Sequence, residues 1–416
     1  METFLPNLSD FQGFKKNWRS DLIAGITVGI VALPLALAFG ITTGTGATSG
    51  LITAIIAGSL AAIFGGSNYQ VSGPTGAMTV VLVPIVTTYG IQSLVWLGIA
   101  AGVIIICFAL FGFGRYIEKV PWSVMEGFTL GIAIIIALQQ IPFVFDVQKS
   151  SGTHTFTVAI STFFTAFKED LHFASISIAI LTLLIKRVWP RIKGYLGAKI
   201  HLPASFVAIS LVTLITQIFS IDVTQIGDLP RTLSLTKNFS FVNISALAFI
   251  YSALIIALLG AIESLLSARV ADSMANKVIN HDQAPHNPKK ELIGQGLATI
   301  TSALAGGLPA TGAIARTSVN VHSGARTRLS AIIHALFLLS VVLFLAPIVE
   351  LIPTAALAGV LIGTSLRIAN PRSVKEALQS TYQFRIVYLA TAISVVLIDL
   401  IWGVLIGIIL EWILSK

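Results

Sequence analysis

Fourteen apolar runs separated by short polar stretches constrain this sequence more than any other feature. A helix that crosses a bilayer needs about 20 mainly apolar residues, and several runs reach that length. Only 11% of the 416 residues are charged, against about 25% in soluble proteins. The sequence therefore predicts an all-α polytopic membrane protein with fourteen transmembrane segments. The expected segments are 22–40, 46–65, 74–90, 93–114, 120–143, 173–185, 203–219, 244–268, 291–305, 310–322, 329–348, 351–366, 386–398 and 400–414.

Lysine and arginine are distributed unevenly between the two sides of these segments. With a cytoplasmic N-terminus, only Lys149, Lys168, Arg231 and Lys237 fall outside. All the others except Arg316 then lie inside, as the positive-inside rule requires. We therefore expect a cytoplasmic N-terminal segment at 1–20, both termini in the cytoplasm, and location in the cell (inner) membrane. These basic loops also explain the net charge of +8, so no nucleic-acid partner is expected.

A short motif recurs between the two halves of the chain. One proline and two glycines repeat at an offset of 232 residues, as Pro121, Gly127 and Gly131 and again as Pro353, Gly359 and Gly363. Seven segments per copy reverse the sense of crossing, so the sequence predicts two inverted seven-segment repeats. Chance recurrence in a glycine-rich chain is the alternative. Inverted repeats with paired interrupted helices are typical of alternating-access transporters.

The third and tenth segments are short and each follows a Gly/Pro break, VSGPTG at 71–76 and GGLPATG at 306–312. Residues before a proline favour an extended backbone, so we expect two half-helices preceded by short extended stretches. A helix that begins inside the membrane leaves N–H groups unpaired there, and these groups bind anions. Thr75, Gly76 and Ala77 would face Thr311 and Gly312 across a small anion. Simple helix capping by the threonines is the alternative.

Two of the charged residues inside apolar segments are candidates for a functional role. Arg316 in the tenth segment would add a full positive charge behind the helix N-terminus, about 7 Å from Thr311 at about 1.5 Å per residue. An arginine near the bilayer centre costs about 3 kcal/mol and usually has a functional role. The alternative is that its side chain extends to the inner surface beside Arg326 and Arg328.

Glu263 lies in the eighth segment, with Ser267 one turn further on the same face. A carboxylate in an apolar environment can carry a proton, or it could bind Na⁺ together with hydroxyls and free carbonyls. We therefore expect Glu263 and Ser267 to couple transport to H⁺ or Na⁺. A purely structural salt bridge with Arg316 is the alternative.

Several stretches resemble the SulP (sulfate permease, solute carrier 26) family of anion transporters. They are PLALAF at 34–39, QVSGPTG at 70–76, ELIGQG at 291–296 and PATGAIART at 309–317. The resemblance implies a core at 21–119 and 244–348 and a gate at 120–219 and 349–416, moving as an elevator in a homodimer. It also implies that Phe39 and Ala315 line the anion site. Most members continue into a STAS domain, and this chain is expected to lack one.

The expected function is H⁺- or Na⁺-coupled symport of a small anion such as fumarate, bicarbonate or sulfate. An uncoupled exchanger or channel is the first alternative. A nucleobase:cation symporter is the second, and Arg316 counts against it because that class would require a carboxylate on the tenth segment. The sequence shows no nucleophile–base pair and no metal-ligand cluster, so we expect neither an enzyme nor a cofactor.

Overall fold

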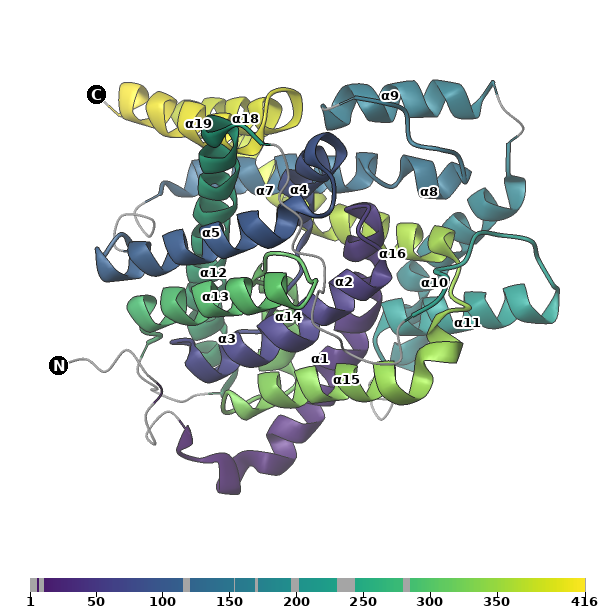
Figure 1. The fold of residues 1–416 in the computed structure, drawn as a ribbon, viewed down its shortest axis with the longest axis horizontal. Coiled ribbons are helices and arrows are strands. Elements are labelled where there is room, and N and C mark those ends of the chain that lie inside the picture. The colour runs from purple at the N-terminus through teal and green to yellow at the C-terminus, as the bar shows by residue number, and fades with distance from the viewer. Residues whose placement is uncertain are drawn as a thin grey trace. The chain divides into compact units, whose positions relative to one another are not determined.

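The computed structural model describes residues 6, 11–114, 120–152, 154–168, 171–195, 202–229, 244–279 and 285–415. Its regular structure is helical apart from one two-stranded sheet (Figure 1). In the first part of the chain the elements are α1 (Phe14–Thr42), α2 (Ala47–Ile52), the π-helix η2 (Thr53–Ala57), α3 (Gly58–Phe64), β1 (Ser72–Gly73), α4 (Gly76–Tyr89), α5 (Ser93–Leu110), α7 (Trp122–Leu138), α8 (Ile141–Phe145), α9 (Thr155–Ala166), α10 (Phe173–Tyr195) and α11 (Ala204–Ile218). The remaining elements are α12 (Ala246–Ile279), α13 (Pro288–Leu304), β2 (Thr311–Gly312), α14 (Ile314–His322), α15 (Leu329–Val349), α16 (Thr354–Ile368), α17 (Pro371–Gln379), α18 (Tyr382–Leu397) and α19 (Leu400–Leu414).

Each of the fourteen expected segments contains at least one helix. In the described chain, seven helices are long and apolar enough to cross a membrane: α1, α2–α3, α5, α7–α8, α10, α12 and α15. Five shorter apolar helices are α4, α9, α11, α18 and α19. The predicted all-α polytopic class is confirmed, and the third and tenth segments are short helices of 14 and 9 residues.

Two helices lie where no segment was expected. The 12 residues of α9 fall short of the roughly 20 needed to cross a bilayer, and five threonines and serines interrupt their apolar pattern. The second helix, α17, is short and contains charged residues. It is capped at its N-terminus by Asn370, whose side chain accepts a hydrogen bond from the Arg372 N–H. Hydropathy alone finds neither helix, because neither has the length or composition of a span.

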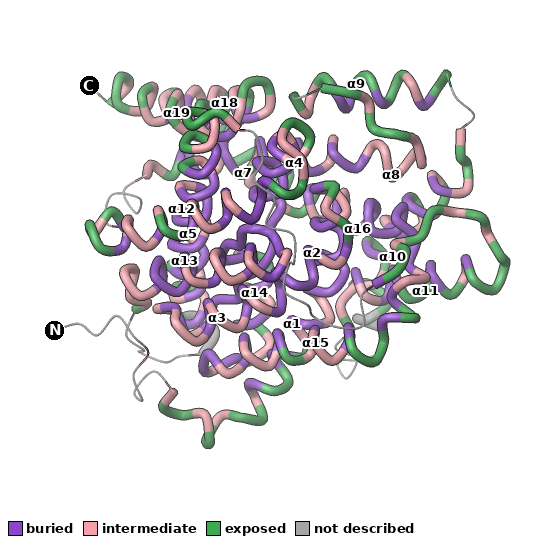
Figure 2. Tube along the Cα trace, in the orientation of Figure 1, coloured by how far each residue is buried: buried purple, intermediate pink, exposed green. Residues whose placement is uncertain are grey.

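The chain forms two compact units, described here one at a time. Unit 1 comprises Met1–Glu118, Lys199–Phe206 and Gly227–Glu350. Within it α13 packs against α5 and α3, α1 packs against α15, and α12 packs against α5 and α14. The second half of α1 and nearly all of α2 are buried (Figure 2).

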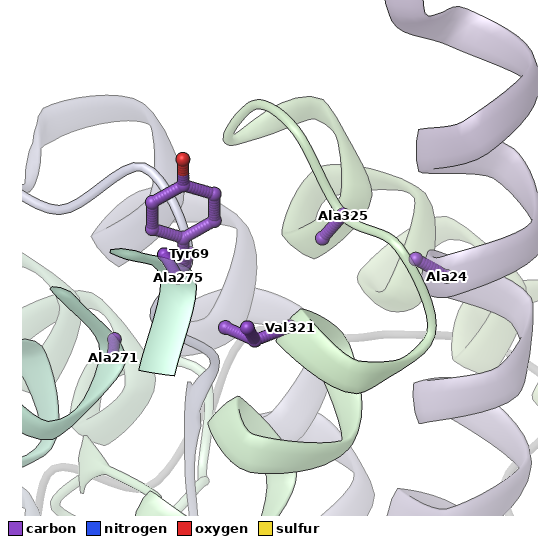
Figure 3. Packing of buried hydrophobic residues seen from close by; sticks show 6 residues of the cluster. All are labelled: Ala24, Tyr69, Ala271, Ala275, Val321 and Ala325. Atoms are coloured by element: carbon purple, nitrogen blue, oxygen red, sulfur yellow. The ribbon is translucent and has the colours of Figure 1, made fainter. Parts of the chain in front are cut away.

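Small side chains dominate the contact between helices in part of unit 1. The cluster in Figure 3 comprises Ala24, Tyr69, Ala271, Ala275, Val321 and Ala325. It joins α1, α12 and α14 to the loop that precedes β1. Without a hydrophobic drive between helices in lipid, small residues allow the close backbone approach that holds such helices together. This packing fixes the elements that carry the two helix breaks.

Unit 2 comprises Lys119–Ala198, Val207–Ile226 and Leu351–Lys416. In it, helices from one half of the chain pack against helices from the other half. Helix α7 of the first repeat packs against α18 of the second, whereas α16 of the second packs against α10 of the first. The repeated prolines, Pro121 and Pro353, each directly precede the first residue of α7 and of α16.

The repeated glycines lie at these crossings. A Cβ at Gly127 would come 2.9 Å from the Cβ of Thr391 in α18, and one at Gly359 would come 2.9 Å from the Cβ of Thr182 in α10. Real side chains almost never approach so closely. The recurrence of the motif therefore has a packing cause in both copies, because each glycine admits the backbone of a neighbouring helix.

Candidate functional site

The two breaks that the sequence singles out meet in unit 1. Strands β1 and β2 pair antiparallel, with Ser72 opposite Gly312 and Gly73 opposite Thr311. A further hydrogen bond runs from the Ala313 N–H to the Val71 carbonyl over 2.9 Å. Both stretches are extended, as the prolines led us to expect, and each leads into a short helix.

Helix α4 begins as predicted. Thr75 precedes its first residue with an extended backbone, and its hydroxyl accepts from the Met78 N–H over 3.3 Å. The N–H groups of Gly76 and Ala77 lie in the first turn, where a helix offers no internal partner. Among the described residues these two groups have no hydrogen-bond acceptor.

Helix α14 begins later than the sequence indicated, at Ile314. The Gly312 N–H donates to the Ser264 hydroxyl over 3.0 Å, so it is not free for an anion. Thr311 belongs to β2 and offers only its hydroxyl. The free N–H groups of this half-helix are therefore those of the first turn at 314–316, and the Gly312 N–H is not among them. The strand pairing, a contact across the chain, causes the shift.

Glu263 on α12 contacts the hydroxyls of both threonines. The Thr75 hydroxyl donates to Oε2 of Glu263 over 2.8 Å. The Thr311 Oγ1 lies 2.5 Å from the same Oε2 and 3.0 Å from Thr75 Oγ1. The three oxygens form a closed triangle where the two breaks meet, and the Glu263 side chain is partly exposed.

Arg316 lies in the first turn of α14, not a turn and a half behind it as expected from Thr311. Its side chain is only 1% exposed, so it does not extend to the inner surface. Nη2 donates to the Pro74 carbonyl over 3.0 Å, and among the described residues Nη1 has no hydrogen-bond partner. In the part of the chain described, no ion pair joins Arg316 to Glu263, which removes the structural salt bridge considered above.

The Ser267 hydroxyl, one turn after Glu263 on α12, has a partner other than the Glu263 carboxylate. It lies 3.2 Å from the Thr317 hydroxyl, which in turn accepts from the Val71 N–H. Ser267 is fully buried and helps to hold β1 against α14. Its predicted role at the ion-coupling position is therefore not supported by the contacts it makes.

Three residues that were predicted to line the anion site differ in exposure. Phe39 is buried in α1, which packs against both α4 and α14. Ala77 is buried in the first turn of α4, whereas Ala315 in the first turn of α14 is exposed. Of these three residues, Ala315 alone is exposed.

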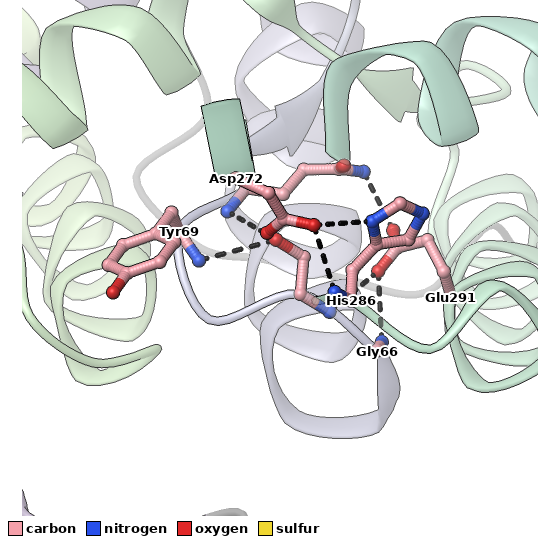
Figure 4. A network of polar contacts seen from close by, with 7 residues as sticks. Gly66, Tyr69, Asp272, His286 and Glu291 are labelled. Atoms are coloured by element: carbon pink, nitrogen blue, oxygen red, sulfur yellow. Dashed lines mark hydrogen bonds and ion pairs between the residues drawn. The ribbon is translucent and has the colours of Figure 1, made fainter. Parts of the chain in front are cut away.

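A second polar network, which sequence reasoning did not find, joins the loop before β1, α12 and the start of α13 (Figure 4). The buried Glu291 carboxylate accepts hydrogen bonds from the loop before β1. Beside it, His286 Nδ1 lies 2.7 Å from an oxygen of Asp272. A sequence signal existed, because Glu291 and Gln295 are polar residues one turn apart in a predicted transmembrane segment. No cluster of three or more His, Cys, Asp or Glu residues suited to a metal was found among the described residues.

Interrupted helices that meet at their N-termini define a class of secondary transporter in which the ligand lies between the half-helices. Residues 18–391 match the sulfate permease family, and the chain belongs to this family of membrane transport proteins. The predicted SulP membership is confirmed. The relatives are transporters, so the chain is not an enzyme.

The chain is 34% identical over 413 residues to the putative sulfate transporter YvdB of Bacillus subtilis, covering 97% of this chain and 74% of that protein. It is 32% identical over 409 residues to the bicarbonate transporter BicA of Picosynechococcus, covering 94% and 69%. The solved transmembrane domain of a cyanobacterial BicA superposes with a TM-score of 0.81 at 30% identity, covering 96% of this chain and 98% of that one. The structure of SLC26A9 gives a TM-score of 0.83 at 14% identity over 97% of this chain and 66% of that one, a likeness of fold alone.

Proposed function

We propose that this protein imports a small anion across the cell membrane by symport with a cation. The observation that carries the proposal is the meeting of Thr75 and Thr311 beside two helix N-termini. The free N–H groups of α4 and α14 are donors, and the helix dipoles place partial positive charge at the same point. The buried Arg316 guanidinium adds a full charge close behind. An anion at this site would be held by fixed groups of the protein.

The anion is proposed by class. Relatives are named for sulfate and for bicarbonate, both small oxyanions. N–H donors and a guanidinium suit any planar or tetrahedral oxyanion, including a carboxylate such as fumarate. Arg316 favours an anion over a neutral nucleobase. Bicarbonate, sulfate and fumarate are therefore the substrates to be compared first.

The oxygen triangle at Glu263 favours H⁺ over Na⁺ as the coupling ion. Each of the three contacts between its oxygens, 2.5, 2.8 and 3.0 Å long, requires one hydrogen. Thr75 and Thr311 supply one hydrogen each. With a neutral carboxylic acid at Glu263 as the third donor, each contact would have its own hydrogen. A sodium ion bound among these oxygens would push them apart.

The two compact units are proposed to work as core and gate. The core would comprise 21–119 and 244–348, which carry the anion and coupling residues, and the gate 120–219 and 349–416. Elevator-type movement of the core against the gate in a homodimer would expose the site to each side in turn. The proposal draws on the family and on the location of every site residue within unit 1.

Uptake into liposomes of labelled bicarbonate, sulfate and fumarate, under imposed pH or Na⁺ gradients, tests the proposal. An acidic exterior should accelerate uptake of the true substrate, because a proton on Glu263 enters with the anion. In Glu263→Gln the amide cannot take up or release a proton, so uptake should lose its response to pH. The control is Glu376→Gln, an exposed carboxylate on α17. Uptake by the wild type that ignores both gradients would instead indicate an uncoupled exchanger or channel.

A further inference from the structure

A stripe of polar side chains runs along one face of α13. Glu291, Gln295, Thr299 and Ser302 follow one another at helical spacing, and each is at most 2% exposed. Four buried polar residues are costly in a membrane helix unless each has partners. All four have partners, and these partners lie in the segments around the two helix breaks.

Glu291 holds the approach to β1. Its Oε2 accepts from the N–H groups of Gly66 and Ser67 over 2.9 and 3.0 Å, and its Oε1 accepts from the Gln70 side-chain amide over 2.7 Å. Figure 4 shows the Glu291 carboxylate turned toward Gly66. All three contacts are N–H donors, so this carboxylate acts only as an acceptor. The loop at 66–70 is thereby fixed to the first turns of α13.

Ser302 and Thr299 hold the approach to β2. The Ser302 hydroxyl donates to the Leu308 carbonyl over 2.7 Å, while the Leu308 N–H donates to Thr53 of η2 over 2.6 Å. The Thr299 hydroxyl donates to the Ala310 carbonyl over 3.4 Å. The loop before β2 is therefore bound along the last turns of the same helix.

Gln295 lies between these two groups and contacts both breaks at once. Its Oε1 accepts from the Ser72 hydroxyl over 3.0 Å, and its Nε2 donates to the Ala310 carbonyl over 2.7 Å. Ser72 lies in β1, three residues before Thr75, and Ala310 directly precedes Thr311. The Gln295 side-chain amide thus joins the segment that precedes Thr75 to the segment that precedes Thr311.

Such a bridge is needed because the sheet itself is minimal. Each strand has two residues, and two-stranded pairings of this length are marginal without further support. We propose that Gln295 is a positioning residue that sets the separation of the two half-helix tips, and thereby the size of anion that the site accepts. The size-selection part of this proposal rests on the proposed function, whereas the part on separation does not.

Gln295→Leu removes both hydrogen bonds at similar side-chain volume. Ser72→Ala is a second variant that removes one of them. The matched control is Thr301→Val, since Thr301 is on α13 but bonds only the carbonyls of its own helix at 297 and 298. In liposome uptake, Gln295→Leu should raise the KM for the preferred anion about tenfold and change the ratio of bicarbonate to sulfate uptake, with the maximal rate nearly unchanged. Ser72→Ala should give a smaller shift in the same direction, and Thr301→Val none.

The separation is measured directly by solving the structure of Gln295→Leu. The contact between the Thr75 and Thr311 hydroxyls should be lost. An intact contact, or unchanged KM and anion ratio in an active variant, overturns the role of Gln295 and leaves the transport function in place. If Gln295→Leu does not fold, Ser72→Ala is read by the same two measurements. A wild type that transports no anion rejects the proposed function, while the variant structure still decides the separation.

Discussion

Glu263 and Glu291 are both carboxylates in unit 1 without a lysine or arginine bonded to them in the part of the chain described, yet their partners differ in kind. Glu263 faces two hydroxyls, which can donate or accept, whereas Glu291 faces only N–H donors. A group surrounded by hydroxyls can gain or lose a proton with a small rearrangement of hydrogens. A group that receives N–H bonds alone cannot donate without losing them. Glu263 is thus suited to proton exchange, whereas Glu291 is suited to holding the loop at 66–70 in place.

At this scale we predict the effect of removing the buried charge. Arg316→Ala should lower anion uptake at least tenfold, about 1.4 kcal/mol, because it removes the full positive charge behind the α14 tip and leaves the Pro74 carbonyl without its donor. Initial uptake rates in liposomes measure the loss. Arg372→Ala, an exposed arginine on α17, serves as the control and should transport normally. Full activity of Arg316→Ala would exclude the guanidinium from the anion site.

The convergence of Thr75, Thr311 and Glu263 could be predicted from the sequence, because each lies at a break or as a lone charge in an apolar run. The partners of Ser267 and Gly312 could not. They depend on the pairing of β1 with β2, which joins residues more than two hundred positions apart and shifts the start of α14 to Ile314. Local rules place helix starts by nearby residues and do not include such pairing.

At the scale of elements, each interrupted segment is one extended strand followed by one short helix, and the two copies lie antiparallel. Apolar runs and the Pro–Gly motif were sufficient to predict the class of fold and the paired breaks. They were insufficient for α9, whose 12 residues match neither a span nor a loop. They also did not reveal the polar stripe on α13, because a buried polar residue stabilises the fold only through hydrogen bonds to another segment, which local patterns do not show.

The repeated glycines provide a prediction at this scale. Gly127→Ala and Gly359→Ala should each destabilise unit 2 by about 1–3 kcal/mol, because the added Cβ forces α7 from α18 or α16 from α10. The melting temperature of the purified protein in detergent measures the effect. Gly194→Ala on α10 is the control, since a Cβ there meets nothing within 4 Å. Equal melting temperatures for all three variants would show that the crossings tolerate a side chain.

At the scale of the whole molecule, the charge distribution predicts which side of the membrane each loop faces. Lys168 lies after α9 and Arg187 lies near the end of α10, and both are exposed. In a Cys107→Ala background, Lys168→Cys should react in intact cells with a thiol reagent that cannot cross membranes. Arg187→Cys should react only after the cells are opened. Labelling of the two positions with the opposite preference would invert the predicted topology.

Helices from the first half of the chain pack against helices from the second half. Their packing therefore cannot be completed until the second half has been synthesised. The Thr311 hydroxyl reaches the ribosome exit 236 residues after that of Thr75, roughly 10–50 s later at ~5–20 residues per second. During that interval the first repeat is made but incomplete. Strand β1 has no β2 to pair with, and α7 has no α18 to pack against. A nascent protein of this design therefore has to keep the backbone groups of its first break away from lipid until its second half is made.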